Sequence, residues 1–154
     1  MSPIHLDLPS GLTTFRRLVL DFTGTLSLDG ILLPGVAGRL RLLAEDLAIT
    51  VLTADTFGTA RRQLRGLPVE ARLIENGAEK AQAVAAMGPE GVIAIGNGRN
   101  DIPMMGEAGL GIGVLGPEGA SAELLSASDV VVRDINDALD LILKPLRLIA
   151  TLRD

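Results

Sequence analysis

The stretch "LVLDFTGTLSLDG", residues 18–30, carries the strongest structural signal in this sequence. Its first residues are apolar, and the run ends at an acid, Asp21. A Thr-Gly-Thr segment follows at 23–25, and glycine beside hydroxyl residues favours a turn. We therefore predict a strand over 17–22 whose carboxyl end bears a carboxylate and then breaks into a tight turn. Because ligands bind at the carboxyl ends of strands in open parallel sheets, this turn is a candidate site for chemistry.

The second half of the stretch predicts a small flap over the site. Asp29-Gly30 lies between apolar residues, and this pair is a hairpin-turn signal. We expect a short hairpin over 27–33, although a plain loop explains the same residues equally well.

Short apolar runs alternate with segments of helical periodicity along the rest of the chain. Such alternation predicts a parallel sheet covered on both faces, which is an α/β, three-layer Rossmann-like fold. Without a repeat or a linker, residues 1–154 are expected to form one domain, with a core over about 17–143 and a tail over 144–154. The expected strands are 17–22, 49–54, 69–74, 91–96, 110–115 and 129–132, and the expected helices are 35–48, 58–64, 78–87, 101–108, 118–127 and 135–143.

Composition excludes several kinds of function. The 154 residues carry a net charge of −5 and only three Phe, with no Trp or Tyr, which argues against a nucleic-acid partner. There is no Cys, and the single histidine, His5, is best explained as an ordinary polar residue, so thiolate and histidine metal sites are not expected. No apolar stretch approaches the ~20 residues of a membrane span, and the N-terminal residues lack the pattern of a secretory signal. A cytoplasmic protein without a membrane partner is therefore expected.

Polar side chains gather where the expected strands end. They can supply an acidic nucleophile, hydroxyls, a cation and a second acid, and this set suits phosphoryl transfer. Mg²⁺ prefers one or two carboxylates with waters and phosphate, and a carboxylate can attack phosphorus. A lysine and a hydroxyl can stabilise the other phosphoryl oxygens. The residues at the strand ends are Asp21, Thr23, Thr25, Thr53, Asp55, Asn97, Asn100 and Asp101, and the cation is Lys80, near the start of the helix expected over 78–87.

Four motifs in this order resemble a known family. They are "DFTGTL" at 21–26, "TADTFGTA" at 53–60, "KAQAV" at 80–84 and "GNGRND" at 96–101. Together they are similar to the haloacid dehalogenase (HAD) superfamily, and within it to the phosphorylation domain of P-type ATPases. The resemblance runs from about residue 17 to 143. The positions that depart from the family pattern are Phe22, Ala54 and Asn97.

The resemblance implies how a metal would be bound. Asp21 would be the nucleophile and a Mg²⁺ ligand, and Thr23 would offer its main-chain carbonyl to the same ion. Asp101 would be the metal-binding acid. Asn97 stands where the family has an aspartate, so its amide oxygen would bind the metal without the charge.

The resemblance also implies the phosphate site. Thr53 and Lys80 would bind the phosphoryl group, with Thr25 beside them, and Lys80 would steady the nucleophile. Asn100 would orient its neighbours. For Asp55 a role in the site and a role as a helix cap stay equally open.

Two further features shape the expected activity. The segment between the first two motifs is too short for the nucleotide-binding insertion of the ATPases, so tight ATP binding is not expected. Neither interval between motifs holds a cap, so the chain resembles the capless members. Its partner would be a phosphorylated small molecule or macromolecule, and a homo-oligomer is expected because an open site needs something to exclude water.

The leading hypothesis is a Mg²⁺-dependent phosphohydrolase that acts through an aspartyl phosphate. Superfamily phosphatases carry a second acid where this chain has Thr23, so dephosphorylation is expected to be slow. The alternative is a phosphate-binding or aspartyl-phosphorylated regulatory module without efficient turnover. A third hypothesis is a subunit whose apolar tail, 144–154, packs on a partner, although packing on its own domain explains that tail better.

Overall fold

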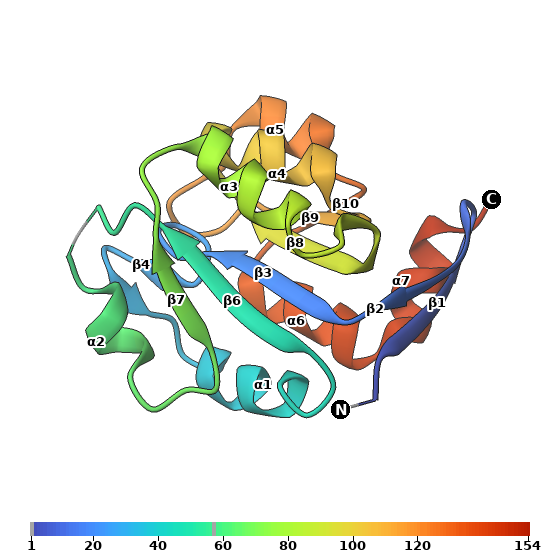
Figure 1. Ribbon diagram of the computed structural model, residues 1–154, viewed down its shortest axis with the longest axis horizontal. Coiled ribbons are helices and arrows are strands. Elements are labelled where there is room, and N and C mark those ends of the chain that lie inside the picture. Colours follow the sequence, from blue (N-terminus) through green and yellow to red (C-terminus); the bar gives the residue numbers. More distant parts are fainter. Residues whose placement is uncertain (1, 57) are drawn as a thin grey trace.

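The computed structural model describes residues 2–56 and 58–154, and its centre is a six-stranded parallel sheet (Figure 1). The strand order is β10–β9–β8–β3–β6–β7. From β3 the chain moves outward through β6 and β7, then returns to the other side of β3 at β8. The end of β3 therefore lies at a topological switch point, where open α/β sheets bind ligands. The strands are β3 (Arg17–Asp21), β6 (Ala48–Thr53), β7 (Glu70–Leu73), β8 (Val92–Gly96), β9 (Leu110–Val114) and β10 (Val130–Val132).

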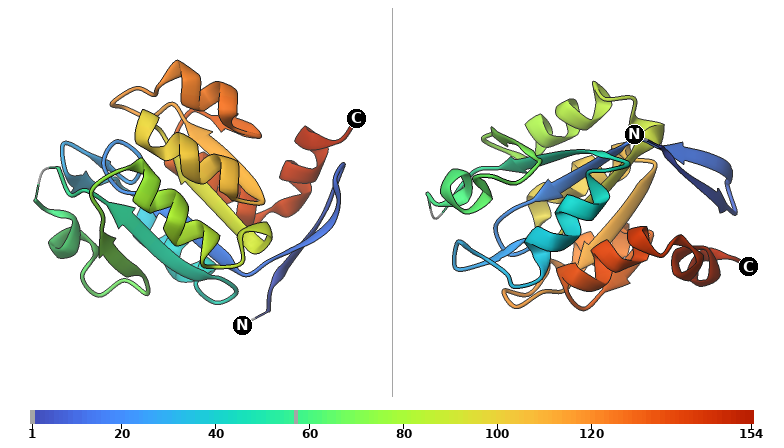
Figure 2. Two further views of the ribbon diagram at one scale, coloured as in Figure 1. Left: turned by 45° about the horizontal axis from the view of Figure 1, so that its top comes forward. Right: turned by 90° about the horizontal axis from the view of Figure 1, so that it is seen from below.

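Helices cover both faces of this sheet, as the right-hand view of Figure 2 shows. Along β3, Leu18 and Leu20 pack into one apolar cluster and Val19 into another, because successive side chains of a strand point to opposite faces. All three are fully buried. The predicted three-layer α/β fold is confirmed. The helices on one face are α3 (Gly77–Ala85), α4 (Ile102–Glu107) and α5 (Ala122–Ala127), and those on the other are α1 (Val36–Leu43) and α6 (Ile135–Leu143).

Several helices are shorter than the sequence pattern predicts. The helix expected over 35–48 ends at Leu43 and continues as turns. The helix expected over 118–127 begins only at Ala122, because the Ser121 side chain caps it by accepting a hydrogen bond from the Leu124 amide. Residues 116–120 consequently form a loop at the carboxyl edge of the sheet. The remaining short elements are α2 (Ala60–Leu64), η1 (Pro89–Gly91) and η2 (Arg99–Asp101).

The predicted flap is a hairpin of β4 (Ser27–Leu28) and β5 (Ile31–Leu32). Asp29 and Gly30 both have positive φ, 52° and 80°, as a two-residue type I′ turn requires. The hairpin is tied to α2: the Leu32 amide donates to Gln63 Oε1 at 2.9 Å, and the Thr59 hydroxyl donates to the Gly30 carbonyl. The flap is therefore held against α2 both along β5 and at its turn.

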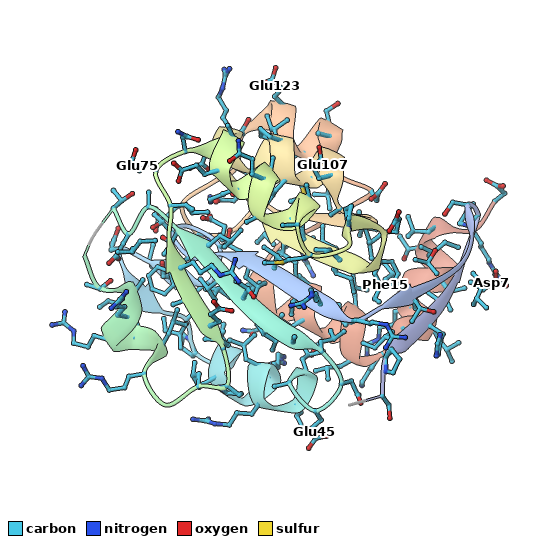
Figure 3. All side chains as sticks on the ribbon, viewed as in Figure 1. Asp7, Phe15, Glu45, Glu75, Glu107 and Glu123 are labelled. Atoms are coloured by element: carbon cyan, nitrogen blue, oxygen red, sulfur yellow. The ribbon has the colours of Figure 1, made fainter. Side chains whose placement is uncertain are left out.

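An N-terminal hairpin was not predicted. It consists of β1 (Ile4–Leu8) and β2 (Gly11–Phe15), and the single histidine, His5, lies in β1. Helix α7 (Pro145–Leu152), which contains most of the tail, lies beside this hairpin (Figures 1 and 2). Figure 3 labels Phe15 where the hairpin meets the body and Asp7 farther out along it. Phe15 and Leu148 are fully buried, so the tail packs on its own chain, as the preferred explanation has it.

In the part of the chain that the structure describes, no helix combines the length and the apolar character needed to cross a membrane.

Candidate active site

The carboxyl edge of the sheet holds a polar cavity of about 420 Å³. Asp21 ends β3, Thr53 ends β6 and Asn97 directly follows β8, and all three line this cavity. Thr23 and Glu118 line it as well. The fold therefore brings together polar residues from the carboxyl ends of three strands, β3, β6 and β8.

A buried ion cluster lies at the base of the site. The Lys80 ammonium, at the start of α3, donates to Asp21 Oδ1 at 2.8 Å and to Asp101 Oδ1 at 2.7 Å. Lys80, Asp101 and Asp21 are 1%, 0% and 5% exposed. Burial of a charge is costly unless it is paired, so this lysine depends on both acids and they depend on it.

The cluster holds two carboxylates and one ammonium. Burial and the charge of Asp101 raise the pKa of Asp21 to about 7, although Lys80 and Thr25 act to lower it. Burial alone would lower the pKa of Lys80, but the charges of Asp21 and Asp101 outweigh burial and raise it. When both acids are ionised, the cluster has an excess of negative charge beside the cavity, and a bound cation would offset it.

Asp101 lies outside the cavity lining, and both of its carboxylate oxygens accept hydrogen bonds. Its Oδ2 accepts hydrogen bonds from the Asn97 and Gly98 amides, both at 3.1 Å, while its Oδ1 accepts from Lys80. A Cβ on Gly96 would lie 2.5 Å from Asp101 Oδ2, so the glycine is required for this approach. These contacts fix both the lysine and the turn that presents Asn97.

Asn97 is half-buried and connects the nucleophile to a neighbouring loop. Its Oδ1 lies 3.2 Å from the Thr25 hydroxyl, which is also 3.2 Å from Asp21 Oδ2. Its Nδ2 donates to the Gly119 carbonyl at 3.0 Å. The amide oxygen therefore faces the nucleophile, and the amide nitrogen faces away from it.

The donor set fits Mg²⁺, which needs only one or two carboxylates in addition to waters and a phosphate. Within residues 2–56 and 58–154, no group of three or more His, Cys, Asp or Glu side chains could share one metal ion. Asp21, Asn97 and Thr23 line the cavity, whereas Asp101 does not. The metal-ligand role of Asp101 stays a prediction, and its present contacts are those of a residue that positions Lys80.

The second motif supplies one site residue and one cap. The Thr53 hydroxyl accepts a hydrogen bond from the Asp55 amide at 2.8 Å, which leaves the hydroxyl proton available to a phosphoryl oxygen. Asp55 Oδ1 accepts from the Thr59 and Ala60 amides, both at 2.9 Å, at the start of α2. Of the two roles left open for Asp55, the structure shows the capping contacts.

Glu118 is a cavity residue that the sequence analysis missed. It lies in the loop after β9, at the same edge of the sheet as the other strand ends. The rule that polar residues follow strands at this edge would have identified it. The helical pattern of residues 118–127 conceals this position in the sequence. Asn100, predicted to orient its neighbours, also lines the cavity.

Comparison with known proteins agrees with this geometry. The model of the haloacid dehalogenase-like hydrolase family matches residues 58–142, more than half of the chain. The chain belongs to this family. Over 63 residues it is 57% identical to an uncharacterised protein of Methanocaldococcus jannaschii, a match that covers 41% of this chain and 68% of that protein.

Solved structures of HAD proteins share the fold. A putative HAD family hydrolase from Streptomyces avermitilis has a TM-score of 0.71 at 22% identity, over 86% of this chain and 87% of that one. The cobalt-bound deoxy-D-mannose-octulosonate 8-phosphate phosphatase of Haemophilus influenzae has a TM-score of 0.71 at 18% identity, over 84% and 88%. The 3-deoxy-D-manno-octulosonate 8-phosphate phosphatase of Moraxella catarrhalis, in complex with magnesium, phosphate and KDO, has a TM-score of 0.66 at 20% identity, over 90% and 94%. This HAD hydrolase therefore has a fold that phosphatases use.

Proposed function

We propose that this chain is a Mg²⁺-dependent phosphohydrolase that forms an aspartyl phosphate on Asp21. The observation that carries the proposal is the buried cluster of Asp21, Lys80 and Asp101, which has excess negative charge and borders a polar cavity. Within the HAD hydrolases, the four motifs favour the group that resembles the phosphorylation domain of P-type ATPases.

The side chains divide the work of the first step. Asp21 attacks phosphorus with a carboxylate oxygen, and the bond from phosphorus to the leaving oxygen breaks. The Lys80 ammonium orients Asp21 and, with the hydroxyls of Thr53 and Thr25, stabilises the charge on the transferring phosphoryl oxygens.

A magnesium ion would be bound by Asp21, the main-chain carbonyl of Thr23 and the amide oxygen of Asn97, with Asp101 as the further predicted ligand. When bound, it would supply positive charge that stabilises the phosphoryl group and favours ionised Asp21. An amide in place of a carboxylate at Asn97 is expected to weaken metal binding.

Thr23 determines which substrates react. A threonine hydroxyl is too weak an acid to protonate a leaving oxygen near neutral pH, and this kind of assistance is worth ~10²–10⁴-fold. Leaving groups that need no proton, such as those of acyl phosphates and nitrophenyl phosphate, are therefore favoured. Thr23 cannot serve as the base for loss of the aspartyl phosphate either, so this step is expected to be slow unless another residue supplies the base.

The alternative function is a regulatory module that binds phosphate or is phosphorylated on Asp21 and hydrolyses it inefficiently. Thr23 and Asn97 favour it, because each replaces an acid of the family pattern. The partner in both cases is a phosphorylated molecule; the phosphatases of similar fold make a small phosphorylated sugar acid one candidate. We also propose that the chain forms a homo-oligomer, in which a second copy covers the open cavity and excludes water from it.

A phosphatase screen tests the proposal. We expect the wild-type protein to hydrolyse acetyl phosphate and nitrophenyl phosphate with MgCl₂ and not with EDTA, and Asp21→Asn to lose this activity. Phosphate release by Asp21→Asn at the wild-type rate would contradict it. A stable phosphoprotein without release of phosphate would favour the regulatory module.

A further inference from the structure

Glu118 gives the cavity a carboxylate that the proposed mechanism does not yet use. It lines the same cavity as Asp21 and Thr23. Its Oε2 accepts a hydrogen bond from the Asp29 amide, at the tip of the flap, at 3.0 Å. Among the described residues, its Oε1 accepts no hydrogen bond, so one oxygen of this carboxylate is available for another donor.

The loop that carries Glu118 is fixed against the nucleophile turn. A Cβ on Gly116 would lie 2.9 Å from the Gly24 carbonyl oxygen, so the loop approaches the turn as closely as only a glycine allows. On the other side, Asn97 Nδ2 donates to the Gly119 carbonyl at 3.0 Å, and the Ser121 amide donates to the Asn97 carbonyl at 2.8 Å. The position of Glu118 is thus coupled to the residues that surround Asp21.

The other acids near the site have different roles. The Asp55 carboxylate caps α2, and the Asp101 carboxylate is fully buried and engaged by Lys80 and two amides. Neither Asp55 nor Asp29 lines the cavity in the way that Glu118 does.

We propose that Glu118 is the general base that hydrolyses the aspartyl phosphate, a role that rests on the proposed function. In this step Glu118 takes one proton from a water molecule, and the water oxygen forms a bond to phosphorus. The bond between phosphorus and the Asp21 carboxylate oxygen breaks, which returns Asp21 as a carboxylate and releases phosphate. The proton on Glu118 then passes to solvent. Such a base must lie across the phosphoryl group from the nucleophile, with a water between, and Glu118 lines the same cavity as Asp21.

The test compares the decay of purified phosphoprotein in Glu118→Gln, Glu118→Ala and wild type. Each is labelled with radioactive acetyl phosphate and Mg²⁺, freed of donor, and followed as label is lost. The glutamine keeps an oxygen that can accept from the Asp29 amide but cannot take a proton, whereas the alanine loses both functions. Glu107→Gln, an exposed glutamate at the end of α4 and outside the cavity, is the matched control.

We expect both Glu118 variants to be labelled as the wild type is, and to lose label ~10²-fold more slowly. Formate should restore decay in Glu118→Ala, because a small carboxylate can occupy the vacated space, and not in Glu107→Gln. Decay of Glu118→Gln at the wild-type rate would overturn the inference and leave Glu118 as a tether of the flap. Absence of label from the wild-type protein would instead contradict the proposed function, and this inference with it.

Discussion

Replacing Lys80 by methionine tests the charge balance of the site. The substitution keeps much of the side-chain volume and removes the only ammonium that contacts Asp21 and Asp101 in the described structure. Asp101 is fully buried and Asp21 is only 5% exposed, so water replaces the lost partner poorly. Removing one member of a buried ion pair costs about 3–5 kcal/mol of unfolding free energy. For a chain of this length, that cost lowers Tm by roughly 6–20 °C.

The stability lost in Lys80→Met is expected to depend on pH. Without Lys80, the pKa of Asp21, already raised to about 7, rises further because a favourable charge is lost. The variant should therefore be least stable relative to wild type at about pH 8, where both carboxylates are ionised, and recover at about pH 5, where Asp21 binds a proton.

Thermal and urea unfolding without divalent metal is the assay. Arg39→Met is the control, because its ion pair with Asp140 is also short, 2.8 Å, but both side chains are about a third exposed, at 32% and 28%. Its loss should cost much less than the loss of Lys80, because water and salt screen a partly exposed ion pair. If Lys80→Met costs no more than Arg39→Met at the higher pH, the cluster does not depend on its lysine and the reasoning fails.

Three further predictions follow from the same site. Thr23→Asp should speed turnover of alkyl phosphates more than that of acetyl phosphate, because only the former need a proton on the leaving oxygen; equal effects in steady-state assays would argue against this. In EDTA, the unfolding free energy should fall as pH rises from about 4 through about 7, because the raised pKa of Asp21 makes the native state bind more protons than the unfolded state. MgCl₂ should reduce this loss of stability. Urea titrations at several pH values, with EDTA and with MgCl₂, measure both effects. Asp55→Ala should lower the unfolding free energy by about 0.5–2 kcal/mol, because α2 loses its cap, while Asp21 is still phosphorylated. Loss of labelling in a folded variant would instead indicate that Asp55 acts in the site.

The sequence predicted the sheet and most of the site because both depend on local patterns. The apolar run before Asp21 and the Asp29-Gly30 turn are readable from neighbouring residues alone. The same holds for the ends of β6 and β8, which carry Thr53 and Asn97. Parallel strands align their carboxyl ends, so residues at these ends had to meet once the strand order placed β3 in the middle.

The features that were missed depend on contacts between distant segments. The hairpin β1–β2 has alternating residues, but a short hairpin is stable only when something packs on it, and that element is α7 at the other end of the chain. Glu118 acquires its place because its loop contacts Gly24 and Asn97, which no local pattern encodes. The burial of Lys80 between two acids likewise follows from tertiary packing: in the sequence it is a lysine on an amphipathic helix.

The proposed function requires that Asp21 becomes covalently phosphorylated. The most direct measurement is mass spectrometry of peptides after brief reaction with acetyl phosphate and Mg²⁺ and an acid quench. We expect one phosphoryl group on the peptide that contains Asp21, removed by hydroxylamine and absent from Asp21→Asn. A phosphoryl group on another residue, or equal modification of Asp21→Asn, would contradict it.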